Sequence, residues 1–131
     1  MKSKRFFSFW LFVAILLVLA IIYFLYQYAV NSPFKISPEV AKILIKNNKI
    51  DIILDVRTEI ERNSLGFYPG SVNISTNDLE TMMPKMYPNK NNLIIVYCNS
   101  GQRARNATEI LRHLGYVNAM YIATSYSSLL N

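Results

Sequence analysis

The sequence predicts a small α/β domain built on a parallel sheet and preceded by one N-terminal transmembrane helix. Two observations predict this fold class: a long apolar run near the N-terminus, and, after it, short apolar runs that alternate with amphipathic helical segments. The chain has 131 residues and a net charge of +6, and three of its cations fall within the first five residues. The rest of the chain is only mildly basic, so we expect no nucleic-acid partner.

The apolar run covers residues 6–26, and Ser8 is its only polar member. As a helix rising about 1.5 Å per residue, the run spans roughly 30 Å, which is the thickness of a hydrocarbon core. A cleaved signal peptide would have a shorter apolar run and a small-residue cleavage site, and the sequence after the run offers no good site. We therefore predict that residues 1–28 form a basic tip and an uncleaved anchor, which contacts lipid through residues 6–26.

Two features of the sequence favour opposite sides of the membrane for the domain. Lys2, Lys4 and Arg5 abut the apolar run, whereas the lysines that follow it are more distant and have Glu39 among them. The positive-inside rule therefore favours a domain on the extracytoplasmic side. A lone functional thiol is easier to keep reduced in the cytosol, which favours the other side.

After a linker at residues 29–36, the domain is expected to occupy residues 37–131. The sequence predicts two buried strands, at residues 50–56 and 93–97, and two brief strands, at residues 72–74 and 119–122. Signals for helix starts and ends predict three helices: one after Ser37, one from Thr76 or Asn77 to Pro84, and one from Gln102 to Leu114. Strands that alternate with helices imply a parallel sheet covered on both faces. The single cysteine and single histidine exclude an intrachain disulfide and most metal sites, so we expect no metal.

The segment from Cys98 to Arg103 (CNSGQR) joins the strand predicted at 93–97 to the helix predicted from Gln102. Sites in open α/β sheets form at the carboxyl ends of the strands. A tight loop there directs successive N–H groups inward and forms a nest for an anion, and Gly101 permits the required backbone conformation. The helix N-terminus and Arg103 both stabilise a thiolate at Cys98. Arg103 also opposes the helix dipole, and no acid in that turn offsets it, which indicates an anion at the loop centre.

Three stretches of the chain resemble the rhodanese family of sulfurtransferases, and together they extend over residues 36–123. They are Leu54–Arg57 with Glu61, Gly66–Ile74, and Val96–Ala104 running on to Tyr116. The resemblance implies that Cys98 attacks a small sulfane-sulfur anion, holds the sulfur as a persulfide and passes it to a thiol or to cyanide, without a cofactor. It also implies that Arg103 binds the donor and that the loop N–H groups stabilise the persulfide. The loop residues concerned are Asn99, Ser100, Gly101 and Gln102.

Two residues of the first stretch have a simpler structural interpretation. Asp55 can bond nearby backbone N–H groups, and Arg57 can pair with Glu61 four residues later. The sequence also departs from the family pattern. Phe67 replaces the family's turn histidine, and three later departures are expected to lie away from the loop. These are Thr124 and Ser125 in place of two glycines, and Leu129 in place of a tryptophan.

Two other functions fit the same residues. A membrane-tethered binding module would keep the rhodanese fold without catalysis, and a buried structural cysteine would suit it. A cysteine phosphatase or arsenate reductase is the other alternative. The resemblance implies five residues between cysteine and arginine in those enzymes, whereas four separate Cys98 from Arg103. The shorter loop makes a smaller cradle, which suits one sulfur atom better than a tetrahedral phosphate.

Overall fold

The computed structural model describes residues 2–130, and the side chains of residues 6–27 and 31–130. The chain divides into two compact units, residues 1–33 and residues 34–131. The side chains of Lys2, Lys4 and Arg5, on which the expected orientation depends, lie outside the described residues. They therefore leave the predicted orientation untested.

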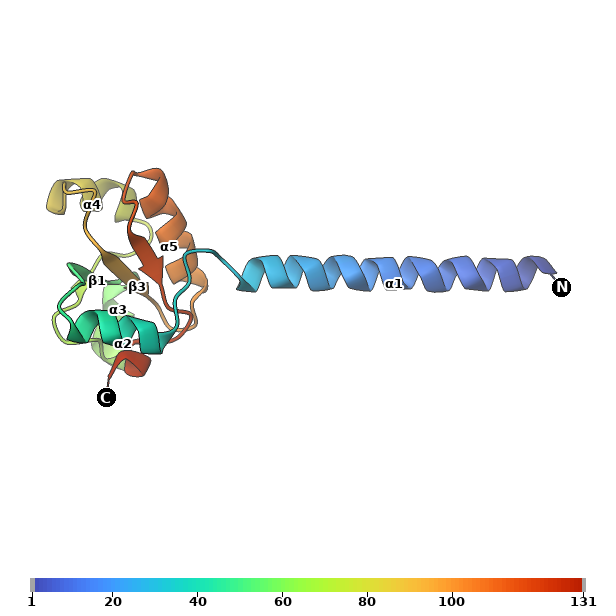
Figure 1. The fold of residues 1–131 in the computed structure, drawn as a ribbon, viewed down its shortest axis with the longest axis horizontal. Coiled ribbons are helices and arrows are strands. Elements are labelled where there is room, and N and C mark those ends of the chain that lie inside the picture. Colours follow the sequence, from blue (N-terminus) through green and yellow to red (C-terminus); the bar gives the residue numbers. More distant parts are fainter. Residues whose placement is uncertain (1, 131) are drawn as a thin grey trace. The chain divides into compact units, whose positions relative to one another are not determined.

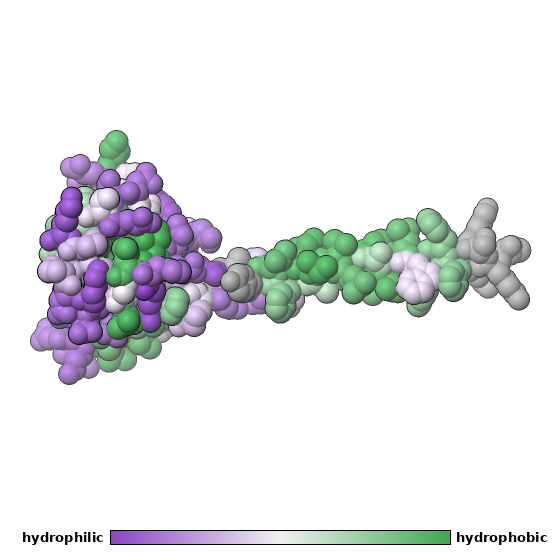
Figure 2. Space-filling model, turned by 90° about the horizontal axis from the view of Figure 1, so that it is seen from above, coloured by the Kyte–Doolittle hydropathy of each residue, from purple (hydrophilic) through white to green (hydrophobic). Residues whose placement is uncertain are grey.

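The first unit is the helix α1 (Lys2–Val30). Within it, Phe6–Gln27 has a mean hydropathy of 2.8, and the side chains of this segment are not buried in the protein. Apolar side chains dominate its surface in Figure 2. The helix is long and apolar enough to cross a membrane, a property that membrane anchors share with signal sequences.

The second unit is built on a four-stranded, all-parallel sheet, which confirms the predicted fold class. The strands are β1 (Ile52–Asp55), β2 (Val72–Asn73), β3 (Ile94–Tyr97) and β4 (Ala119–Tyr121). They lie in the order β2-β1-β3-β4, and the last residues of the two central strands, Asp55 and Tyr97, are register partners. Because all strands run in one direction, the residues that follow β1 and β3 meet at the same edge of the sheet.

Four helices and one 3-10 turn accompany the sheet in the described part of this unit (Figure 1). They are α2 (Pro38–Lys46), α3 (Glu59–Leu65), α4 (Leu79–Met86), α5 (Gln102–His113) and η1 (Tyr126–Leu129). Helices α4 and α5 pack on one face of the sheet, and α2 and η1 pack on the other. Phe34 and Ile36, which the sequence assigns to the linker, hydrogen-bond to Tyr121 along β4.

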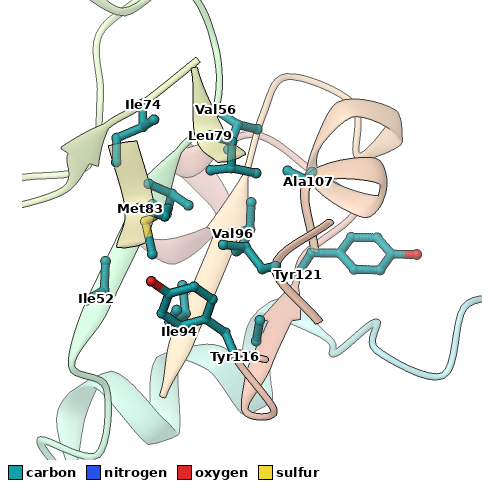
Figure 3. Close-up of a cluster of buried hydrophobic side chains, with 14 of the residues drawn as sticks. Ile52, Val56, Ile74, Leu79, Met83, Ile94, Val96, Ala107, Tyr116 and Tyr121 are labelled. Atoms are coloured by element: carbon teal, nitrogen blue, oxygen red, sulfur yellow. The ribbon is translucent and has the colours of Figure 1, made fainter. Parts of the chain in front are cut away.

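Alternation along the central strands divides the core into two layers. Ile94, Val96 and Cys98 belong to the layer beneath α4 and α5. Figure 3 shows this layer, with Ile94 and Val96 among its labelled residues. Ile95 and Tyr97 belong to the layer beneath α2 and η1. Successive strand residues point to opposite faces, so the register of β3 directs Cys98 towards α5 and Tyr97 away from it.

The prediction for the helix α4 is wrong in two respects. The helix continues past Pro84 to Met86, and Asp78 precedes it instead of Thr76 or Asn77. Proline removes a single hydrogen bond, and the fully buried Met83 holds the turn against the core, so the helix is not interrupted. The side chain of Asp78 makes no cap bond, and it accepts instead from the hydroxyl of Ser75.

Candidate active site

Cys98 follows β3 directly and lies just before the N-terminus of α5. Its side chain is a free thiol that is only 1% exposed. The backbone N–H of Gly101 donates to Cys98 Sγ over 3.0 Å. A donated N–H and a helix N-terminus are both features that favour negative charge on a sulfur atom.

Gly101 has a conformation and a position that only glycine tolerates. Its φ of +105° lies in the left-handed region. A Cβ atom on Gly101 would lie 2.5 Å from the Cα of Ala123 and 2.9 Å from its Cβ. The segment that follows β4 therefore presses against the loop. The prediction that the departures at Thr124 and Ser125 lie away from the loop is wrong, because they directly follow this contact.

Arg103 is paired with a carboxylate that the sequence did not assign to it. Its Nη1 donates to Glu61 Oε2 over 2.8 Å, and its Nη2 donates to Glu61 Oε1 over 2.7 Å. These bonds lower the pKa of Glu61 well below its ordinary value, and they raise the pKa of Arg103. The carboxylate that pairs with Arg103 thus comes from α3, and the predicted anion at the loop centre stays a prediction.

Glu61 is held in place by a capping box at the start of α3. The hydroxyl of Thr58 accepts from the N–H of Glu61 over 3.3 Å, and the N–H of Thr58 donates to Glu61 Oε2 over 3.0 Å. Neither this helix nor the role of Glu61 was among the features predicted from the sequence. The pattern Thr58-x-x-Glu61 is the signal that would have found them.

Asp55 and Arg57 form a buried ion pair, with side chains 0% and 1% exposed. Arg57 Nε donates to Asp55 Oδ1 over 2.9 Å, and Nη2 donates to Asp55 Oδ2 over 2.7 Å. Arg57 also donates from its backbone N–H to Asp55 Oδ1, so the predicted backbone bond of Asp55 is present. The predicted pairing of Arg57 with Glu61 is wrong, because the bidentate partner lies two residues before Arg57. The bonds to Asp55 raise the pKa of Arg57.

Asn99 connects the buried pair to the pair at the surface. Its Oδ1 accepts from Arg57 Nη1 over 3.2 Å, and its Nδ2 donates to Glu61 Oε1 over 3.2 Å. The remaining predicted loop side chains, Ser100 and Gln102, are exposed. A chain of polar contacts thus runs from Asp55 through Arg57, Asn99 and Glu61 to Arg103.

Tyr97 supports this chain from the opposite face of the sheet, and sequence reasoning did not identify it. Its hydroxyl donates to Asp55 Oδ2 over 3.0 Å and accepts from the N–H of Tyr68 over 3.2 Å. Burial raises the pKa of Tyr97. Within the residues that the structure describes, every buried side-chain nitrogen and oxygen has a hydrogen-bond partner. Such a network is rigid because each member has its partners.

Phe67, at the position of the family's turn histidine, packs against a cation. The guanidinium of Arg62 lies 3.8 Å from the centre of the Phe67 ring. Arg62 also donates to the hydroxyl and the carbonyl of Ser71, over 2.8 and 2.9 Å. The stacked ring and the two hydrogen bonds tie α3 to the segment before β2. A cation–π contact therefore occupies the position of the family's turn histidine.

Comparisons with known proteins agree with this architecture. The rhodanese-like domain family matches residues 37–131, and the chain belongs to this family. The thiosulfate sulfurtransferase PspE of Escherichia coli is 32% identical over 65 residues, which are 50% of this chain and 62% of that protein. The match thus spans less than two thirds of the E. coli enzyme.

Solved structures of similar fold include two at 26% identity. The human single-domain sulfurtransferase TSTD1 superposes with a TM-score of 0.61 and covers 76% of this chain and 96% of its own. A rhodanese-related protein from Thermoplasma volcanium superposes with a TM-score of 0.59 and covers 73% of this chain and 89% of its own. The chain is thus a rhodanese-like domain preceded by one apolar helix.

Proposed function

We propose that the protein is a membrane-anchored sulfurtransferase that carries sulfane sulfur as a persulfide on Cys98. The observation that carries this proposal is the Gly101 N–H donated to Cys98 Sγ over 3.0 Å, at the N-terminus of α5. The names of the E. coli and human relatives, a thiosulfate sulfurtransferase and a single-domain sulfurtransferase, support the same class of reaction.

The proposed reaction has two balanced steps. The Cys98 thiolate attacks the outer sulfur of a sulfane donor such as thiosulfate, a new S–S bond forms, and the donor's own bond to that sulfur breaks. The leaving group, sulfite in the case of thiosulfate, departs with the electron pair of the broken bond. An acceptor thiolate or cyanide then attacks the outer sulfur, and Cys98 leaves as a thiolate, ready for another cycle.

The loop residues and the residues that position them have different roles in this reaction. The Gly101 N–H stabilises negative charge on the sulfur at Cys98, and Arg103 recognises the anionic group of the donor. Exposed Asn99, Ser100 and Gln102 form the rim that the donor meets. Asp55 and Arg57 touch no substrate in this mechanism, and they act as positioning residues through Asn99. No metal or cofactor takes part.

The anchor and the domain boundaries are part of the proposal. Residues 1–28 form the basic tip and anchor and residues 37–131 the domain, and the last residues of the linker at 29–36 hydrogen-bond to β4. The apolar surface of Phe6–Gln27 supports the anchor, and the charge bias favours a domain on the extracytoplasmic side. Carbonate washing of expressing cells tests the anchor. An uncleaved chain that stays with the membrane supports it, and a shortened chain in the soluble fraction identifies a cleaved signal sequence.

Steady-state transfer of sulfur from thiosulfate to cyanide tests the activity, with the full chain in detergent. Cys98→Ser must abolish turnover without unfolding the protein. Arg103→Ala should raise KM for thiosulfate about tenfold, because a charge-assisted hydrogen bond to the donor is lost. Arg105→Ala is the matched control, because Arg105 lies on the same helix and pairs with Glu109. Persistent turnover in Cys98→Ser would refute the role of the cysteine.

The non-catalytic binding module is the second candidate, and the 1% exposure of Cys98 favours it, because an acceptor must reach that sulfur. Folded wild-type protein with a free thiol and no turnover with any sulfane donor would support the module. The phosphatase alternative predicts release of phosphate from an aryl phosphate instead.

A further inference from the structure

The cation that is expected to bind the anionic donor is already paired with an anion. Arg103 is the loop's cation, and both of its terminal nitrogens donate to Glu61, over 2.8 and 2.7 Å. These two bonds use the pair of N–H donors that could otherwise bind a sulfate-like or sulfonate-like group. Asn99, the residue next to Cys98, donates to the same carboxylate over 3.2 Å.

We infer that the Glu61 carboxylate occupies the anion-binding position of the Cys98 loop, and that a small anionic donor must displace it from Arg103. Glu61 therefore determines donor specificity: it lowers the affinity of the loop for dianions such as thiosulfate and favours sulfane donors without a charged terminal group. Because the donor class comes from the proposed sulfurtransferase function, on which this inference rests, its test must not depend on turnover.

The solvent exposure of Arg103 and Glu61 allows another anion to replace the carboxylate in this ion pair. The side chains of Arg103 and Glu61 are 39% and 28% exposed, whereas those of Arg57 and Asp55 are 1% and 0% exposed. Solvent-exposed pairs shift an equilibrium by only about two- to fivefold, so an incoming dianion can compete with the carboxylate. Solvent anions cannot reach the buried pair of Asp55 and Arg57, so this pair stays intact and keeps Asn99 in position.

Glu61 also keeps its position when Arg103 turns away. Its Oε2 accepts from the N–H of Thr58 over 3.0 Å and from the hydroxyl of Thr58 over 2.9 Å, independently of Arg103. The capping box thus holds the carboxylate next to the loop. The retained negative charge then opposes binding of a dianion.

Titration of the loop with inorganic sulfate tests the inference. The full chain, labelled with nitrogen-15 in detergent micelles, is titrated as wild type, Glu61→Gln and Glu59→Gln, and the amide shifts of Gly101 and Gln102 are followed. Glutamine preserves the capping box, so Glu61→Gln is expected to fold. Glu59→Gln is the matched control, because Glu59 is an exposed acid in the same turn of α3.

We expect Glu61→Gln to lower the Kd for sulfate about threefold to fivefold, and Glu59→Gln to change it less than about twofold. Adding Arg103→Gln to Glu61→Gln should remove the gain. Sulfate binding by Glu61→Gln that is weaker than wild type, or no tighter than that of Glu59→Gln, would overturn the inference. Tighter binding in a protein without turnover would leave the inference standing and refute only the proposed function.

Discussion

Replacing Gly101 with alanine should destabilise the domain more than an ordinary glycine substitution. The residue has a φ of +105°, and a left-handed backbone costs an alanine about 1–2 kcal/mol. The added Cβ would also lie 2.5 Å from the Cα of Ala123, which belongs to the backbone and cannot rotate away. Forced overpacking of this kind costs about 1–3 kcal/mol. We therefore expect Gly101→Ala to lower the free energy of unfolding by about 2–5 kcal/mol.

Gly70→Ala separates the two contributions. Gly70 has a φ of +80°, but a Cβ there would meet nothing within 4 Å, so only the backbone cost of about 1–2 kcal/mol remains. Urea unfolding of both variants and wild type, monitored by far-UV circular dichroism, compares their free energies of unfolding. Equal losses in the two variants would refute the close approach of Ala123 to the loop.

Three further predictions use the same unfolding assay. Arg57→Lys keeps the charge but loses the bidentate bond to Asp55 and the bond to the Gly66 carbonyl, so it should cost about 1–3 kcal/mol, and an unchanged midpoint would contradict the buried pair. Tyr97→Phe deprives Asp55 of its phenol donor and should cost about 1–3 kcal/mol, whereas an unchanged midpoint would show that the hydroxyl is dispensable. Because Arg103 lowers the pKa of Glu61 below its ordinary 4.5, the stability from this pair is present above that pH and is lost as the pH falls further. Wild type should therefore lose part of its advantage over Glu61→Gln on going from about pH 5 to about pH 3, and a constant difference would refute the pairing.

The architecture could be predicted from the sequence because local signals agree with the tertiary fold. The apolar runs that predicted strands at 50–56 and 93–97 contain β1 and β3, which are short and buried between two layers of helices. The cap and proline at Ser37 and Pro38 predicted the start of α2, and the hydroxyl of Ser37 accepts from the N–H of Val40. These features depend on neighbours within a few residues, which a sequence displays directly.

The partners in the candidate site could not be predicted in the same way. The sequence offers several carboxylates as partners for Arg57 and for Arg103, and how α3 packs against the loop determines which of them pair. Local spacing favoured Glu61 for Arg57, but the fold brings Glu61 to Arg103, 42 residues away. The contact between Gly101 and Ala123 has the same origin, because adjacency of β3 and β4 creates it.

Intact-mass spectrometry of the full chain before and after thiosulfate tests the central claim most directly. We predict that the wild type gains one sulfur atom, that cyanide removes it, and that Cys98→Ser gains none. No gain in a folded protein with a free thiol, or an equal gain in Cys98→Ser, would contradict sulfur transfer through Cys98.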